Sequence, residues 1–237
     1  MLYLKLAISV NILDYFGLFS VNWNKMRTTP REVCSLLVKD RFQLSDIQKD
    51  VLVGTLLGDG NLSYRGRNCR LHIKHSLNQL VLVDYKRKVF EDITSMKVRK
   101  FTQAVGEKDY NFAEFVTLTH PEFSKYHNLF YPSGKKSIPR DIDKLLITPL
   151  SLAVWFMDDG AADYAGASLQ THSFTEEDVV RLMKVLKLNF EIYTTKRLNK
   201  GSWIIYFPKA SMKRLRQLIG VHMLEEFKYK LIPYSIR

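Results

Sequence analysis

The chain contains the same unusual pattern twice: an apolar, helix-like segment that ends in Asp-Gly. The first segment, "VLVGTLLGDG", covers residues 51–60, and the second, "SLAVWFMDDG", covers residues 151–160. Asp59 and Asp159 are therefore 100 residues apart. Repetition of this kind indicates that one structural unit occurs twice, so the fold has to accommodate two related halves.

Both segments are preceded by residues that commonly begin helices. Ser45 and Gln48 form a capping-box pattern before the first segment. In the second, Thr148 is a suitable N-cap and Pro149 fits the first helical position. Each segment is therefore predicted to be a helix that carries its acidic residue at the C-terminal end.

The residues after each helix also repeat in order. Residues 70–74, "RLHIK", alternate polar and apolar as a half-buried strand does, and residues 167–171, "ASLQT", do so more weakly. Both runs lead into a His-Ser pair. The other shared features are amphipathic helical stretches at 78–93 and 175–190, strand candidates at 98–103, 112–119, 192–198 and 202–207, and the motifs KSIP (136–139) and KLIP (230–233).

This order of elements predicts an α+β fold with two pseudo-symmetric halves, each arranged αββαββα. We assign the first half to residues 41–143 and the second half to residues 144–237. Residues 1–40 are predicted to be an N-terminal extension of uncertain structure, because they match neither copy of the repeat.

The charge of the chain indicates the kind of partner it meets. The sequence has 36 Lys and Arg against 24 Asp and Glu, a formal net charge of +12. A protein this basic commonly binds a polyanion, and nucleic acid is a stronger candidate than an anionic membrane surface. No run of about 20 apolar residues predicts a membrane-spanning helix. Cys34 and Cys69 are too few for a disulfide framework or a zinc cluster, which favours a reducing compartment.

An aspartate at the C-terminal end of a helix is unfavourable by roughly 0.3–1 kcal/mol, because that end carries partial negative charge. Here the arrangement occurs twice, on helices apolar enough to be buried against each other. Gly54 and Gly58 share one face and would allow a close approach, and Ala153 could serve the same purpose in the second helix. If the two helices pair in parallel, Asp59 and Asp159 meet at one end, where a hard cation such as Mg²⁺ would offset their repulsion.

These residues carry a family resemblance. "LVGTLLGDG" (52–60) and "LAVWFMDDG" (152–160) resemble the two signature motifs of the LAGLIDADG homing endonucleases, in the branch whose single chain holds both motifs. The resemblance extends over about residues 44 to 234. It implies two αββαββα halves whose antiparallel sheets together form a DNA-binding saddle.

The resemblance also implies roles for individual residues. Asp59 and Asp159 would bind divalent metal, Mg²⁺ with Mn²⁺ able to substitute, assisted by the backbone carbonyls of Gly58 and Asp158. The side chain of Asp158 is not expected to be a ligand, since Gly58 stands at the matching place in the first motif. The catalytic residues implied in this way are Asp59, Asp159, Lys136 and Lys230, with the two lysines positioning water or stabilising phosphate charge.

Sequence recognition is expected from the strands, because a two-stranded ribbon fits the major groove of DNA. Arg70, His72 and Lys74 alternate with apolar residues, which would give that strand one cationic face. The alternative for each of these side chains is an ordinary solvated strand face. The candidate DNA-binding residues are Arg65, Arg67, Arg70, His72, Lys74, His75, Ser168, Gln170, His172, Lys196, Arg197 and Lys200. By resemblance, His75 and His172 match positions where the family often keeps a polar residue near the attacking water.

Other conspicuous segments are predicted to have no part in the site. "YKRK" (85–88) and "KRLRQ" (213–217) are expected to be solvent-exposed helix faces. Trp155, Phe156 and Trp203 are expected to be core residues rather than platforms on which bases stack.

The sequence therefore predicts a monomeric, site-specific homing endonuclease. It would hydrolyse both strands of a long, asymmetric double-stranded DNA site, leave short 3′ overhangs and promote intron mobility. The main alternative is an intron maturase, which would bind RNA to assist splicing. A DNA-binding repressor without metal is disfavoured, since a pure binder has no need of the two acids. The resemblance places the protein in an organelle, either chloroplast or mitochondrion.

Overall fold

A computed structural model describes residues 43–236, and the predicted N-terminal extension (1–40) lies outside these residues. The first half contains α3 (Asp46–Leu57), β1 (Asn61–Arg65), β2 (Asn68–Ser76), α4 (Leu80–Val89), β3 (Arg99–Val105), β4 (Lys108–Val116) and α5 (Pro121–Phe130). The second half contains α6 (Pro149–Asp159), β5 (Gly160–Ala162), β6 (Ala167–Leu169), α7 (Glu176–Phe190), β7 (Thr195–Asn199), β8 (Ser202–Phe207) and α8 (Lys209–Ile219). Short 3₁₀ segments are η3 (Leu77–Gln79), η4 (Glu91–Ile93), η5 (Ile142–Lys144), η6 (Glu225–Leu231) and η7 (Tyr234–Ile236). The order αββαββα occurs twice, which confirms the predicted α+β fold with two related halves.

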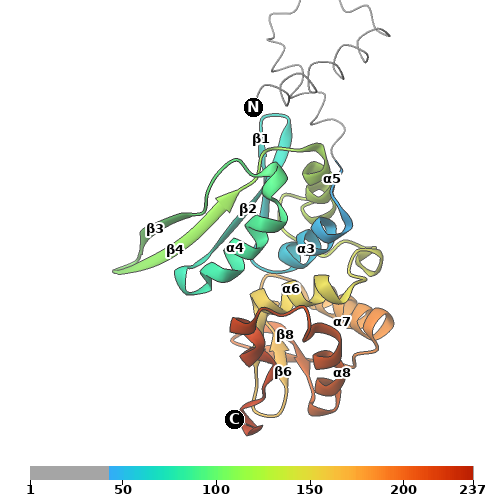
Figure 1. The fold of residues 1–237 in the computed structure, drawn as a ribbon. Helices are drawn as coiled ribbons and strands as arrows, with labels where there is room; N and C mark the ends of the chain where they lie inside the picture. The colour runs from blue at the N-terminus through green and yellow to red at the C-terminus, as the bar shows by residue number, and fades with distance from the viewer. Residues whose placement is uncertain (1–42, 237) are drawn as a thin grey trace, which may run out of the picture. The chain divides into compact units, whose positions relative to one another are not determined.

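Each half has one four-stranded antiparallel sheet. The strand orders are β1-β2-β4-β3 and β5-β6-β8-β7, so the two sheets are built in the same way (Figure 1). Gly66, Gly106 and Gly201 have positive φ in the hairpins β1–β2, β3–β4 and β7–β8. These glycines allow the tight left-handed turns that such hairpins need.

Helices α3 and α6 lie side by side and contact each other extensively (Figure 1). A Cβ atom at Gly54 would lie 2.4 Å from the carbonyl oxygen of Ser151 and 2.8 Å from Cβ of Val154. The predicted close approach at Gly54 is therefore confirmed, although the nearest side chain of α6 is Val154 and not Ala153. Both helix starts are also as predicted, with the capping box at Ser45 and a Thr148 cap before Pro149.

The core lies between each sheet and its helices. Side chains along β2 alternate strictly, so that Leu71 and Ile73 are buried while His72 and Lys74 are half-buried on the outer face. Trp155 and Phe156 are fully buried as predicted, whereas Trp203 is only half-buried. No helix in residues 43–236 has both the length and the apolar character needed to cross a membrane.

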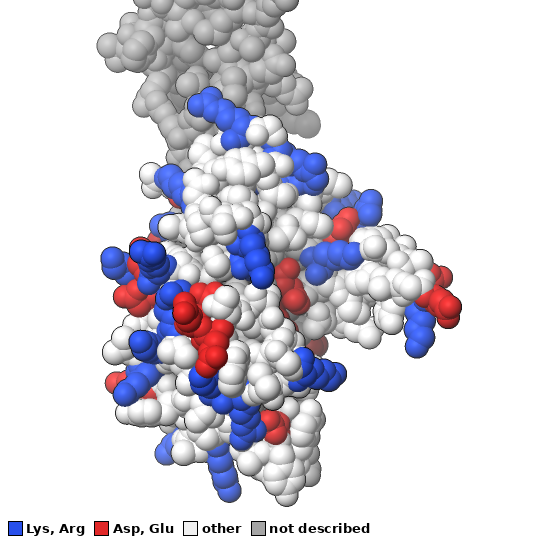
Figure 2. Space-filling model, turned by 180° about the vertical axis from the view of Figure 1, so that it is seen from behind, with Lys and Arg blue, Asp and Glu red and all other residues white. Residues whose placement is uncertain are grey.

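The outer surface carries both signs of charge. Figure 2 shows Lys and Arg spread over the face behind that of Figure 1, with smaller groups of Asp and Glu between them. On this face, the basic residues are thus spread out rather than gathered in one uniform patch.

Candidate functional site

The two repeated aspartates end the paired helices. Asp159 is the last residue of α6, and Asp59 follows α3 by two residues, since α3 ends at Leu57. The side chain of Asp59 is 50% exposed, and its pKa is lowered chiefly by a hydrogen bond with His75. Asp59 thus remains a carboxylate that is open to a ligand.

Asp159 is in a different environment. Burial raises the pKa of its carboxyl to about 8, and repulsion from Asp59 and Asp158 acts in the same direction. The backbone N–H of Asp59 donates to Oδ2 of Asp158 at 3.3 Å, so the acidic ends of the two helices lie together, as predicted for helices that pair in parallel. Their oxygen donors fit a hard divalent cation, which would relieve that repulsion. Within residues 43–236, no three His, Cys, Asp or Glu side chains form a metal-binding cluster, so water, carbonyl or phosphate oxygens would have to complete the coordination.

The two lysines of the Lys-x-Ile-Pro motifs reach the same helix ends. Lys136 Nζ donates to the carbonyl oxygens of Gly58 (2.6 Å) and Gly60 (3.0 Å). Lys230 Nζ donates to the carbonyls of Met157 (2.6 Å) and Asp158 (3.2 Å). The structure thus brings both lysines to the acidic motifs in matched positions.

This placement has two chemical consequences. The Gly58 and Asp158 carbonyls, expected to be metal ligands, each accept a hydrogen bond from a lysine here. Burial lowers the pKa of Lys136 to about 8 and also lowers the pKa of Lys230. The lysines lie at the negative ends of the helix dipoles, where a cation is favoured.

His75 is on the buried face of its strand and not on the outer face with Arg70, His72 and Lys74, where its predicted contact with DNA would require it to be. Its side chain is 1% exposed, and Nδ1 lies 3.3 Å from Oδ2 of Asp59. The alternation of β2 explains this, because His75 has the same parity as Leu71 and Ile73 and so points to the helix side. The geometry therefore places His75 beside Asp59 rather than on the outer face of the sheet.

Lys86 corrects another expectation. "YKRK" was predicted to be a solvent-exposed helix face, but the Lys86 side chain is 0% exposed. Its Nζ lies 2.6 and 2.8 Å from the two carboxylate oxygens of Asp158, whose side chain is also 0% exposed. Lys86 is in α4 of the first half and Asp158 in α6 of the second, so this buried ion pair joins the halves.

The outer face of the first sheet carries the predicted Arg70, His72 and Lys74, all half-buried. Sequence reasoning missed their partners on the neighbouring strands. His72 Nε2 lies 3.0 Å from Glu114, and Lys74 Nζ donates to Gln103 at 2.6 Å. Because residues paired across strands share a face, the alternation of residues 112–116 could have indicated Glu114.

The second sheet agrees less well with the expectation. Ser168 is buried and accepts a hydrogen bond from Gln170, so it does not present a free polar group on the surface. His172 is exposed but follows β6, which ends at Leu169 and is shorter than predicted. Lys196 and Arg197 are consecutive in β7 and therefore point to opposite faces of the sheet.

The remaining residues predicted to bind DNA are either in hairpin turns or lie over aromatic rings. Arg65 and Arg67 are exposed at the β1–β2 turn, and Lys200 is exposed at the β7–β8 turn. Arg197 lies 3.1 Å from the ring centre of Tyr206, and Lys196 lies 4.7 Å from that of Trp203. The exposed turn residues are thus free of the packing that holds Lys196 and Arg197.

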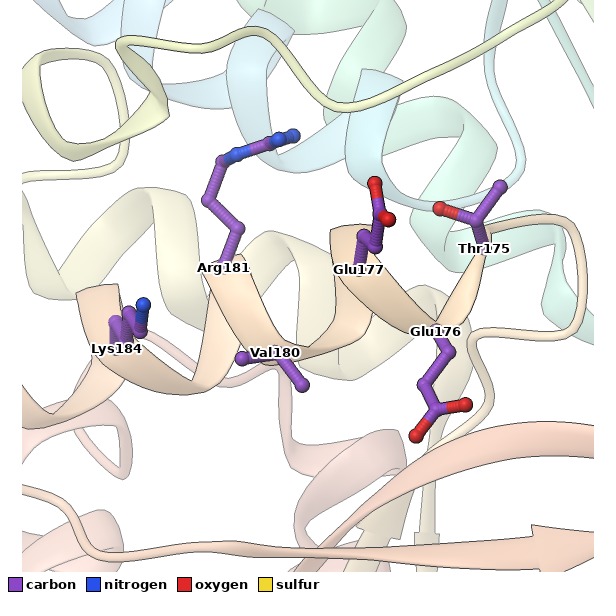
Figure 3. Close-up of a pocket in the computed structure, with 6 residues that line it drawn as sticks. All are labelled: Thr175, Glu176, Glu177, Val180, Arg181 and Lys184. Carbon is purple, nitrogen blue, oxygen red and sulfur yellow. The ribbon is translucent and has the colours of Figure 1, made fainter.

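An open hollow of about 770 Å³ runs along α7 and is separate from the acids. Figure 3 shows that Glu177 and Arg181 point to one side of this helix while Glu176 points to the other. Arg181 is held by Asp178 and by the carbonyl of Ile138. Since neither Asp59 nor Asp159 lines it, this hollow is not the candidate site. The six lining residues are Thr175, Glu176, Glu177, Val180, Arg181 and Lys184.

Known proteins match this chain over most of its length. It is 28% identical to "Cytochrome b mRNA maturase bI2" of Debaryomyces hansenii, over 92% of this chain and 87% of the relative. It is 29% identical to "Probable intron-encoded endonuclease 1" of Wickerhamomyces canadensis, over 84% of this chain and 91% of the relative. Among solved structures, the homing endonuclease I-WcaI bound to its DNA recognition sequence matches with a TM-score of 0.78 and 26% identity, covering 88% of this chain and 96% of that one.

The family model described as "LAGLIDADG DNA endonuclease family" matches residues 49–215. This span contains α3 except its first three residues, all of α6, both acidic motifs and all eight strands of the two sheets. The resemblance noted from the two motifs is confirmed: the chain belongs to the LAGLIDADG DNA endonuclease family, with both motifs in one polypeptide.

Proposed function

We propose that this protein is a homing endonuclease that hydrolyses both strands of a specific double-stranded DNA site with divalent metal. The observation that carries the proposal is the meeting of Asp59 and Asp159 at the ends of paired helices, each end with its own lysine. Two phosphodiesters have to be cut, and the site offers two acids and two lysines in matched positions.

The outer faces of the two sheets are the proposed DNA-binding surface. On the first sheet, Arg70, His72 and Lys74 are spaced two residues apart, as side chains that read successive base edges have to be. On the second sheet, Gln170 is the half-buried polar residue suited to adenine. Arg65, Arg67 and Lys200 in the exposed turns are proposed to contact phosphates, which positions the duplex without reading its sequence.

In the proposed mechanism, Asp59 and Asp159 hold divalent metal, Mg²⁺ with Mn²⁺ able to substitute. The bound metal would supply an activated water and stabilise charge on the attacked phosphate and on the leaving oxygen. Lys136 and Lys230 place an ammonium near each acidic helix end, where negative charge on the phosphate increases in the transition state. The carbonyls of Gly58 and Asp158 remain candidate ligands through their second lone pairs.

The products and origin follow the family resemblance. We propose short 3′ overhangs, a long asymmetric site and a monomeric enzyme, because one chain already holds both motifs. The relatives named intron-encoded endonuclease and cytochrome b mRNA maturase support an intron origin and an organellar setting.

The experiment begins by selecting a DNA site from a randomised duplex library by retention on the protein in EDTA. Adding Mg²⁺ to the selected duplex should produce a double-strand break, and EDTA should prevent it. Retention of the duplex without any cleavage in Mg²⁺ or Mn²⁺ would overturn the nuclease proposal.

Intron maturation is the second candidate, supported by the relative named a cytochrome b mRNA maturase. The basic surface could bind RNA as well as DNA, and the two activities are compatible in one protein. In a parallel test, labelled transcripts of introns with their exons are incubated with the protein, and splicing rates are compared with and without it. An unchanged splicing rate would remove this second candidate.

A further inference from the structure

Lys86 stands out because a lysine is almost never fully buried unless it is paired. Its side chain is 0% exposed, and the carboxylate of Asp158 accepts from its Nζ at 2.6 and 2.8 Å. Burying both charges is expensive, and a buried pair of this kind is weak evidence of a stabilising role. Stability alone therefore does not account for this pair.

Lys86 has a second contact, which leads to a catalytic acid. Its Nζ lies 3.4 Å from Nε2 of His75, whose Nδ1 lies 3.3 Å from Oδ2 of Asp59. An ammonium group has only hydrogen atoms to donate, so Nε2 of His75 is the acceptor and the proton of a neutral ring is on Nδ1. Lys86 thereby selects the tautomer of His75 that donates toward Asp59 or Gln79.

The ion pair supports Asp59 by a second route. Oδ2 of Asp158 accepts a hydrogen bond from the backbone N–H of Asp59 at 3.3 Å. Gly58 makes this possible, because a Cβ atom there would lie 2.5 Å from the same carboxylate oxygen. Lys86 therefore fixes the backbone of Asp59 through Asp158 and its side chain through His75.

The other half lacks this arrangement. Gly58 is the residue of the first motif that corresponds to Asp158, so the first motif has no side-chain carboxylate at the position that supports Asp59 in the second. His172, the counterpart of His75, is exposed rather than buried next to an acid. The environment of Asp159 is thus set by burial and by repulsion from the other acids.

We propose that Lys86 is a positioning residue that makes the two half-sites unequal, by holding Asp59 in a fixed geometry through His75 and Asp158. The two DNA strands are then cut at different rates, and the difference depends on Lys86. This inference rests on the proposed endonuclease function and adds the origin of strand preference to it. Lys86 itself does not touch DNA, because it is completely buried.

The test measures the rate of cleavage of each strand separately. The selected duplex is end-labelled on one strand or the other, and the products formed with Mg²⁺ are resolved on denaturing gels. The proposal predicts that Lys86→Met changes the ratio of the two strand rates on the order of tenfold, as displacement of a positioned catalytic group does. His75→Ala should change the ratio in the same direction.

Two further variants separate positioning from folding. Lys86→Met leaves Asp158 as an uncompensated buried charge, whereas Lys86→Met/Asp158→Asn removes both charges and should fold better. The double variant should keep the altered ratio, since His75 still lacks its partner. Lys88→Met removes an exposed lysine of the same helix and should leave the ratio at the wild-type value.

The outcomes are distinct. A loss of folded protein lowers both strand rates by the same factor, so an unchanged ratio in Lys86→Met and in the double variant would overturn the positioning role. A wild-type ratio restored in the double variant would also overturn it, because the pair would then serve only to balance charge. Absence of cleavage by the wild-type protein would instead overturn the endonuclease function, and this inference with it.

Discussion

Lys136 and Lys230 are bound to the carbonyl ends of the acidic motifs, at 2.6 Å from Gly58 and Met157 respectively. Lys135 is adjacent to Lys136 but exposed, which makes it a matched control. We expect Lys136→Met and Lys230→Met each to slow cleavage by about tenfold or more with little loss of binding, because a transition-state contact is removed. Single-turnover rates at saturating protein measure this.

The control should behave differently. Lys135→Met should alter only the affinity for DNA and its dependence on salt. If all three variants lost affinity equally and kept the wild-type cleavage rate, the lysines would be phosphate-binding residues with no part in the chemistry.

The pH dependence of stability follows from Asp159, whose pKa is raised by burial from its ordinary value of 3.8 to about 8. The folded protein binds this proton more tightly than the unfolded chain does. The contribution of Asp159 to stability is therefore complete below about pH 4 and is lost as the pH rises through about 8. In EDTA, Asp159→Asn should lose less stability than wild type between about pH 5 and pH 9, as measured by thermal unfolding. Parallel losses in the two proteins would contradict the assignment.

The close pairing of helices α3 and α6 depends on the absence of a side chain at Gly54. Alanine is a better helix former than glycine by about 1 kcal/mol. However, its Cβ would lie 2.4 Å from a backbone oxygen of α6, which cannot move away easily. Overpacking of this kind costs about 1–3 kcal/mol, so Gly54→Ala should reduce the free energy of unfolding.

A glycine in open space provides the comparison. Gly106 has a φ of 63°, and a Cβ atom added there would meet no other atom within 4 Å. Asparagine tolerates this left-handed conformation better than most residues do. Gly106→Asn should therefore change the stability very little in urea titrations. A Gly54→Ala protein as stable as wild type would show that the helix pair can separate without loss.

Much of this architecture could be predicted because the repeat signals are local. The helix starts at Ser45 and Thr148 and the strand 70–74 depend on neighbouring residues alone, and all of them agree with the structure. The alternation that placed Arg70 on the outer face also places His75 on the inner face. That signal was present in the sequence, although His75 was assigned to DNA.

The residues whose positions were predicted wrongly are those whose surroundings come from parts of the chain that are distant in sequence. Lys86 was expected to be exposed because its neighbours are charged, and only the fold brings Asp158, 72 residues away, against it. Ser168 was expected on the outer face because residues 167–171 alternate polar and apolar, yet it is buried. Strand β6 is only three residues long, and the full burial of its residues depends on packing that no local pattern reports.

For the whole molecule, the net charge of +12 predicts DNA binding that is sensitive to salt. With six to ten phosphate contacts, affinity should fall by about 10³–10⁵ between 50 and 200 mM salt. Arg67→Ala should reduce the slope of log affinity against log salt by about 1, whereas Gln170→Ala should leave it unchanged. Equal slopes for wild type and Arg67→Ala would remove Arg67 from the phosphate contacts.

Two motifs in one chain also predict the oligomeric state. The protein should be a monomer of 27.7 kDa in light scattering, alone and on DNA, and its selected site should be asymmetric. A stable dimer bound to a palindrome would contradict the proposal that each half of the chain serves one strand.

Asp59 and Asp159 are proposed to act together, through divalent metal, in the cleavage of both strands of DNA. The most direct measurement follows a supercoiled plasmid with one selected site, incubated in Mg²⁺ with wild type, Asp59→Asn or Asp159→Asn. Wild type should yield linear plasmid, while each variant should still bind the site but fail to produce the double-strand break. Linear plasmid formed by either variant at the wild-type rate would contradict the assignment of these two acids.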